Sequence, residues 1–184
     1  MIRIAFVVLV AFCGLRAASA VAQEALPRER PSCHARVYDG AHFAGHPKQL
    51  VAAISFERGA REIAQEKQWH DSAGPDDSEV AATLRVRFRG RSKVHTARLV
   101  CDGDRGKDLQ CGVVTCGGGR VRVDVEKDAI RIMIGGALKN GAFVPHYIHL
   151  DESCDAAPER QFVLESGEDD RVFLLPSARI EACR

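Results

Sequence analysis

The sequence has none of the motifs that usually mark an enzyme. It contains neither a G-x-S-x-G nucleophile turn nor an H-E-x-x-H zinc motif. Paired carboxylates occur at Asp76-Asp77 and at Asp169-Asp170, but both pairs fall in turn-like segments, where solvated charge is the usual state. We therefore expect a protein that is not an enzyme and that uses no cofactor.

An excess of positive charge is also lacking. The 26 Lys and Arg residues nearly balance the 25 Asp and Glu residues, and the formal net charge is +1 with histidines neutral. Arg3 and Arg16 lie in an N-terminal segment that we expect to be removed, so the remaining chain would carry about −1. Proteins that bind nucleic acid or attach electrostatically to membranes usually carry a basic tract. No such tract stands out in this sequence, so we expect neither kind of binding.

Long apolar runs are confined to the N terminus. Arg3 is followed by an uncharged run from Ile4 to Phe12, and Ala20-Val21-Ala22 provides an A-x-A cleavage pattern. Ala18-Ser19-Ala20 is the alternative site, and Arg16 interrupts the run before it reaches the roughly 20 residues that span a bilayer. Residues 1–22 are therefore predicted to be a signal peptide, with no transmembrane segment after cleavage. The short form of the signal favours a periplasmic or secreted bacterial protein.

Six cysteines lie after this segment. An even number in an exported chain indicates disulfides, and six cysteines allow 15 pairings. A zinc site is the competing interpretation, but the pair with four residues between its cysteines has no second pair to complete a site. Our predicted disulfides are Cys33 with Cys183, Cys101 with Cys111, and Cys116 with Cys154.

The rest of the chain is dominated by short segments of β type. The segment from Leu84 to Arg89 alternates strictly, so that one face is apolar and the other is a row of arginines. About eight such segments, joined by turn residues, predict a single-domain, all-β fold over residues 33–184, either an antiparallel barrel or a sandwich reinforced by disulfides. Residues 23–32 read as an extended lead-in. Residues 57–79 read as one long polar loop with a turn or two of helix.

The densest group of chemically useful side chains lies early in this domain. His42 and His46 are four residues apart, and one helical turn would place both on the same face, a spacing that suits zinc, copper or nickel. His34 or Asp39 would add a further ligand. The alternative is that these histidines cap and pack a short connection between two strands, ended by Pro47.

Residues 33–49, the cysteine-rich middle and the segment from Asp169 to Phe173 resemble a group of small exported bacterial proteins of unknown function. The resemblance covers most of the chain after the signal peptide. It implies the location and the single domain, and it brings no catalytic residues. The series of strands with one long loop leads us to expect a non-enzymatic periplasmic binding or inhibitory module with an unknown protein or small-molecule partner. A metal-binding protein and a structural component of the cell envelope remain open alternatives.

Overall fold

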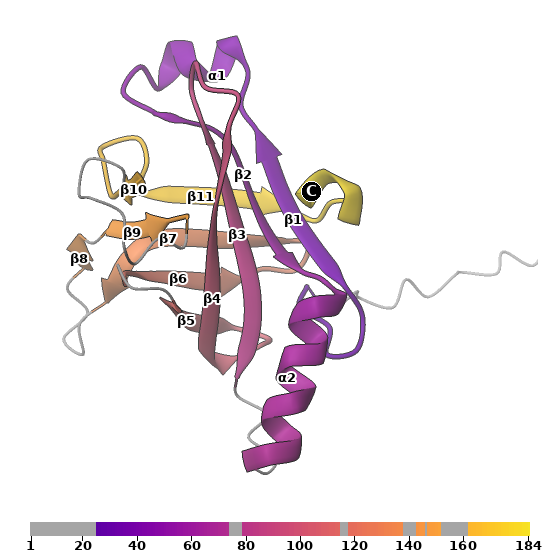
Figure 1. Cartoon of the computed structure of the whole chain (residues 1–184). Coiled ribbons are helices and arrows are strands. Elements are labelled where there is room, and N and C mark those ends of the chain that lie inside the picture. The colour runs from indigo at the N-terminus through magenta and orange to yellow at the C-terminus, as the bar shows by residue number, and fades with distance from the viewer. Residues whose placement is uncertain (1–24, 74–78, 115–117, 138–142, 146, 152–161) are drawn as a thin grey trace, which may run out of the picture.

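The computed structural model describes residues 25–73, 79–114, 118–137, 143–145, 147–151 and 162–184, which form mainly antiparallel strands (Figure 1). The strands are β1 (Ser32–Val37), β2 (Val51–Arg58), β3 (Val80–Phe88), β4 (Val94–Asp104), β5 (Asp108–Val113), β6 (Arg120–Val125), β7 (Ala129–Ala137), β8 (Phe143–Pro145), β9 (Tyr147–Leu150), β10 (Phe162–Glu165) and β11 (Val172–Pro176). The helices are α1 (Gly40–Gly45), α2 (Ala60–Ala73) and the 3₁₀ helix η2 (Ile180–Cys183).

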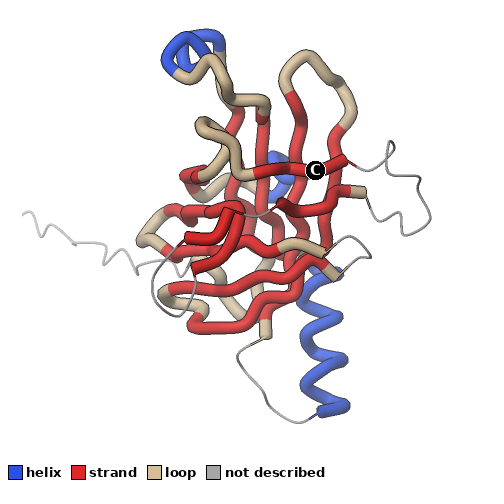
Figure 2. Tube along the Cα trace, turned by 90° about the vertical axis from the view of Figure 1, so that its left-hand side faces the viewer, coloured by secondary structure: helices blue, strands red, loops and turns tan. Residues whose placement is uncertain are grey.

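Eight of the strands form one nearly closed sheet, in the order β1-β2-β3-β4-β5-β6-β7-β11. Figure 2 shows this sheet wrapping around a common interior. The seam lies between β11 and β1, where His34 and Ser177 form an antiparallel bridge and the Ala178 N–H donates to the Cys33 carbonyl at 2.8 Å. The predicted all-β, eight-strand fold is thus confirmed, and the closure identifies it as barrel-like.

The barrel interior is filled by one side of each strand. Successive side chains along a strand point to opposite faces, and an eight-stranded barrel is just wide enough for side chains to fill it. In β3, for example, Leu84 and Val86 are fully buried, whereas Arg85 and Arg87 face outward. The apolar core includes Val80, Ala82, Leu84, Val86, Ala97, Leu99, Val121, Val123, Ile130, Ile132, Ile134, Phe173 and Leu175.

Two of the three predicted disulfides are confirmed. Cys101 and Cys111 are directly paired across β4 and β5, and Cys33 of β1 is bonded to Cys183 of η2. The second bond closes a sequence separation of 150 residues, for which a chain-entropy estimate gives roughly 5 kcal/mol of stabilisation. The predicted partners Cys116 and Cys154 lie outside the described residues.

The segment predicted to be a long polar loop is different in the structure. Strand β2 continues through Arg58, and residues 60–73 form the 14-residue helix α2. The side chain of Glu62 accepts a hydrogen bond from the Gly59 N–H at 3.0 Å, as the third residue of a helix does in a capping box. Apolar spacing does not reveal this helix because it turns carboxylates toward the barrel: Glu62 and Glu66, one turn apart, are both buried.

No described helix is long and apolar enough to cross a membrane.

The lead-in and α2 meet near one end of the barrel. Leu26 is fully buried in the core, and the buried Arg58 guanidinium donates to the carbonyls of Pro27, Arg28 and Arg30. The same guanidinium pairs with Glu66 of α2. Residues 25–32 of the lead-in are therefore part of the folded domain.

Candidate functional site

The predicted histidine cluster lies on α1, in the connection between β1 and β2. Asp39 caps this short helix, since its carboxylate accepts a hydrogen bond from the His42 N–H at 2.8 Å. The helix ends at Gly45, and Pro47 follows. The local sequence thus forms the single helical turn that the metal hypothesis requires, but the Asp39 carboxylate serves as a cap.

The two histidines are brought together as a ring stack. Their centroids lie 4.4 Å apart with an interplanar angle of 23°. His42 Nε2 lies 2.9 Å from Gln49 Oε1, and because the Gln49 amide nitrogen donates to the Val51 carbonyl, this bond makes His42 Nε2 the donor. Metal-binding lone pairs lie in the ring plane, so a shared ion would require the stacked rings of His42 and His46 to rotate.

No group of three His, Cys, Asp or Glu side chains among the residues that the structure describes is arranged to hold a metal ion. His34, the other candidate ligand, is buried on the inner side of β1 opposite Phe56. Metal binding by His42 and His46 stays a prediction, which elemental analysis of untagged protein would test.

The acidic pair Asp169 and Asp170, which precedes β11, holds the connection between β1 and β2 in place. Burial raises the pKa of Asp170 and the charge of Asp169 adds to this rise, while hydrogen bonds from the Leu50 and Val51 N–H groups, at 2.6 and 3.2 Å, oppose it. Asp169 accepts from the Lys48 N–H at 3.0 Å. The expectation of solvated charge is therefore wrong for Asp170, which is only 3% exposed. Asp76 and Asp77 lie outside the described residues.

A groove that the sequence did not reveal lies on the outer wall of the barrel. The strand register builds two adjacent rows across β1, β2, β3 and β4. One row is Val37, Ala53, Arg87 and Val94, and the other is Ala35, Ser55, Arg85 and Thr96. Small side chains in the middle of larger ones leave a hollow of about 200 Å³. Ala182 to Arg184 border it, positioned by the disulfide that anchors η2.

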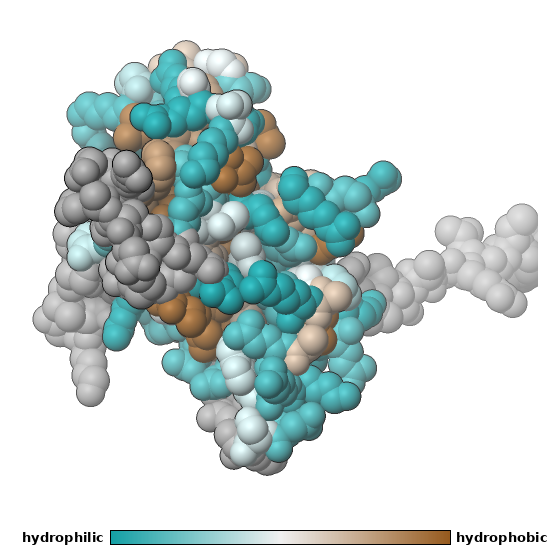
Figure 3. Space-filling view, viewed as in Figure 1, coloured by the Kyte–Doolittle hydropathy of each residue, from teal (hydrophilic) through white to brown (hydrophobic). Residues whose placement is uncertain are grey.

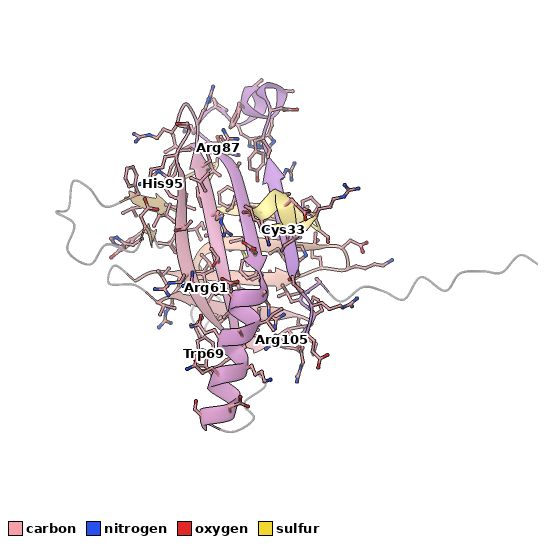
Figure 4. The ribbon with its side chains drawn as sticks, turned by 45° about the vertical axis from the view of Figure 1, so that its right-hand side comes forward. Cys33, Arg61, Trp69, Arg87, His95 and Arg105 are labelled. Carbon is pink, nitrogen blue, oxygen red and sulfur yellow. A yellow bond between two sulfur atoms is a disulfide. The ribbon has the colours of Figure 1, made fainter. Side chains whose placement is uncertain are left out.

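Four arginines line the groove, and the two that β3 contributes, Arg85 and Arg87, differ in their partners. Arg85 forms an ion pair with the buried Glu57, which neutralises much of its charge. The side chain of Arg87 is half-buried and makes no hydrogen bond or ion pair within the described parts of the chain. Figure 4 shows Arg87 near one end of β3, well apart from Arg61 on α2. Among the described strand arginines that line the groove, Arg87 is thus the one whose guanidinium is free, and it lies beside a floor of small side chains.

The surface around this region is mostly hydrophilic, with separate apolar patches (Figure 3). Val37 and Val94, at the two ends of the Arg87 row, are 71% and 47% exposed. Sequence alternation predicted the row of arginines. It could not show that alanines from two other strands lie beside them, because that depends on the register of the sheet.

A buried histidine that pairs with an aspartate was also not predicted from the sequence. His95 Nδ1 lies 2.8 Å from Asp151, whose other oxygen accepts from the Thr96 N–H at 3.1 Å. Burial alone would raise the pKa of Asp151, but bonds from Lys93, Thr96 and His95 outweigh it and lower the pKa overall. The His95 ring packs against Phe162 of β10, with centroids 4.0 Å apart. This arrangement ties the β9–β10 hairpin to β4.

No known protein family, curated protein or solved structure matches the chain.

Proposed function

We propose that this protein is exported, to the periplasm of a bacterium or beyond, and that it is a non-enzymatic binding module. Export is supported by the signal-type sequence of residues 1–22 and by the two disulfides, because disulfides persist in oxidising compartments. The module takes a ligand in the outer groove across β1 to β4.

The observation that carries this proposal is the free guanidinium of Arg87. The barrel interior is occupied by core side chains, so the outer wall is the better place for a ligand. A guanidinium is costly to leave half-buried without a partner, and it matches a carboxylate in a planar, two-point hydrogen-bonded geometry. The groove therefore favours a carboxylate ligand.

The rest of the groove indicates what the carboxylate is attached to. Ala35 and Ala53 form an apolar floor, and the exposed Val37 and Val94 extend it at both ends. Burying these apolar surfaces against a ligand is worth roughly 25 cal/mol per Å². The ligand class is accordingly a carboxylate with a short apolar part, either a free acid or the C-terminal residue of a protein partner.

Calorimetric titration of the purified, oxidised protein tests the proposal. Hexanoate serves as the free-acid probe, and a peptide with a C-terminal leucine serves as the protein-type probe. R87A should weaken binding about tenfold or more, because a charge-assisted hydrogen bond contributes about 1.5–3 kcal/mol. R61A removes an exposed arginine on α2 and should leave binding unchanged.

The proposal would be contradicted if neither probe binds, if hexylamine binds as tightly as hexanoate, or if R61A and R87A weaken binding equally. Tighter binding of the peptide than of hexanoate would identify a protein C terminus as the source of the carboxylate, and the reverse order would identify a free acid.

A further inference from the structure

A second cavity lies at the seam where the barrel closes. It has a volume of about 170 Å³ and is bordered by the lead-in, by the β6–β7 turn and by the segment that follows β11. Ser32 and His34 of β1 line it, together with Lys127 and Asp128 at the turn. The strand bridge between β1 and β11 also falls here, at His34.

Three polar atoms in this wall are buried and have no hydrogen-bond partner among the described residues. They are Ser32 Oγ and both ring nitrogens of His34. His34 is only 1% exposed, and it lies two positions after Ser32 along β1, so the two side chains share one face of the strand. Buried polar groups in folded proteins are normally paired, and an orphaned group of this kind calls for an explanation.

The chemistry of these groups selects an uncharged ligand. Burial lowers the pKa of His34 to about 4, so at neutral pH the imidazole offers one N–H donor and one acceptor. The Ser32 hydroxyl offers one of each. A carboxylate could only accept and an ammonium could only donate, whereas neighbouring hydroxyl groups satisfy donors and acceptors together. At the exposed rim, the charges of Lys127 and Asp128 cancel.

The size of the cavity limits the ligand further. A cavity of about 150 Å³ in another protein holds one benzene molecule. The seam cavity therefore has room for a molecule of roughly six to eight non-hydrogen atoms. We propose that the seam cavity is a binding site for a small polyol, which hydrogen-bonds to the His34 ring and the Ser32 hydroxyl.

This site is independent of the outer groove and of the carboxylate ligand proposed for it. The test is a titration of the full, oxidised protein with erythritol, followed through the ring nitrogen NMR signals of His34. We expect a saturable shift of both ring nitrogens. S32A should weaken binding at least fivefold, and S92A, which removes an exposed hydroxyl in the β3–β4 turn, should leave it within twofold of the parent.

H34F complements S32A, since it should abolish erythritol binding, which calorimetry measures because this variant lacks the reporting ring; if H34F fails to fold, S32A alone decides the question. The proposal is overturned if erythritol causes no saturable shift, which would mean that the cavity holds ordered water only. It is also overturned if S32A and S92A bind alike, or if acetate binds as tightly as erythritol.

Discussion

His34 is a neutral histidine in a wall of the barrel, because burial lowers the pKa of its imidazole to about 4 from an ordinary value of 6.5. The unfolded chain therefore binds a proton more readily than the folded chain between these two values. Stability due to this difference is fully present above pH 6.5 and is lost as the pH falls toward 4.

We predict that this loss reaches about 3 kcal/mol at pH 4, since each pKa unit corresponds to about 1.36 kcal/mol. Urea unfolding at several pH values would measure it. H34F should lack this component while it keeps the changes due to other titrating groups. Parallel pH curves for the parent and H34F would show that His34 is not responsible.

Glu66 presents a different case, since it is a buried carboxylate with several donors. It accepts from Arg58 at 2.7 Å, from Arg105 at 3.1 Å and from the Ala81 N–H at 2.9 Å. E66A would leave two buried guanidinium groups without this partner, and removing one member of such a network typically costs about 3–5 kcal/mol. E168A removes an exposed carboxylate and should cost less than about 1 kcal/mol. Thermal or urea unfolding compares the two variants, and equal losses would contradict the account.

At the scale of elements, Glu66 and Glu62 explain why α2 packs on the barrel. Glu62 accepts from the Thr83 hydroxyl at 2.8 Å, and Glu66 accepts from the Ala81 N–H, so both residues reach the outer face of β3. The contact between helix and sheet is thus largely polar. A loosened α2 after E66A should therefore show faster amide hydrogen exchange in the helix before the barrel itself opens.

The same elements show how far the sequence could predict the structure. The strict alternation from Leu84 to Arg89 predicted a strand correctly, because period-two spacing reports which face is buried. The spacing in α2 could not do so, since its inward residues are carboxylates and their partners, such as Arg58, lie elsewhere in the chain. Sequence patterns report burial of apolar groups far better than burial of paired charges.

The candidate site was harder to predict from the sequence than the fold was. Asp39, His42 and His46 could be singled out because they are close in the sequence, and they do cluster on α1. The outer groove requires the register of four strands, and Arg87 and Ala53 become neighbours only when β2 and β3 pair. No local pattern contains that information.

At the scale of the whole molecule, the Cys33–Cys183 bond joins the first strand to the last helix and holds one border of the groove. We predict that replacing both cysteines by alanine will cost more stability than replacing Cys101 and Cys111, because the first bond closes 150 residues and the second closes 10. Urea unfolding measures both losses.

The first replacement should also weaken hexanoate binding, because it releases η2 from the groove, whereas the second should leave binding nearly unchanged. Binding that is insensitive to both replacements would show that η2 is not part of the site.

Our central proposal is that the barrel binds its carboxylate ligand on its outer wall and not in its interior. Intermolecular NOE measurements between hexanoate and the methyl groups of the protein test this most directly. We predict contacts from the hexanoate chain to Val37 and Val94, which lie at the two ends of the Arg87 row. Contacts to the interior methyl groups of Val86 and Ile132 would contradict the account.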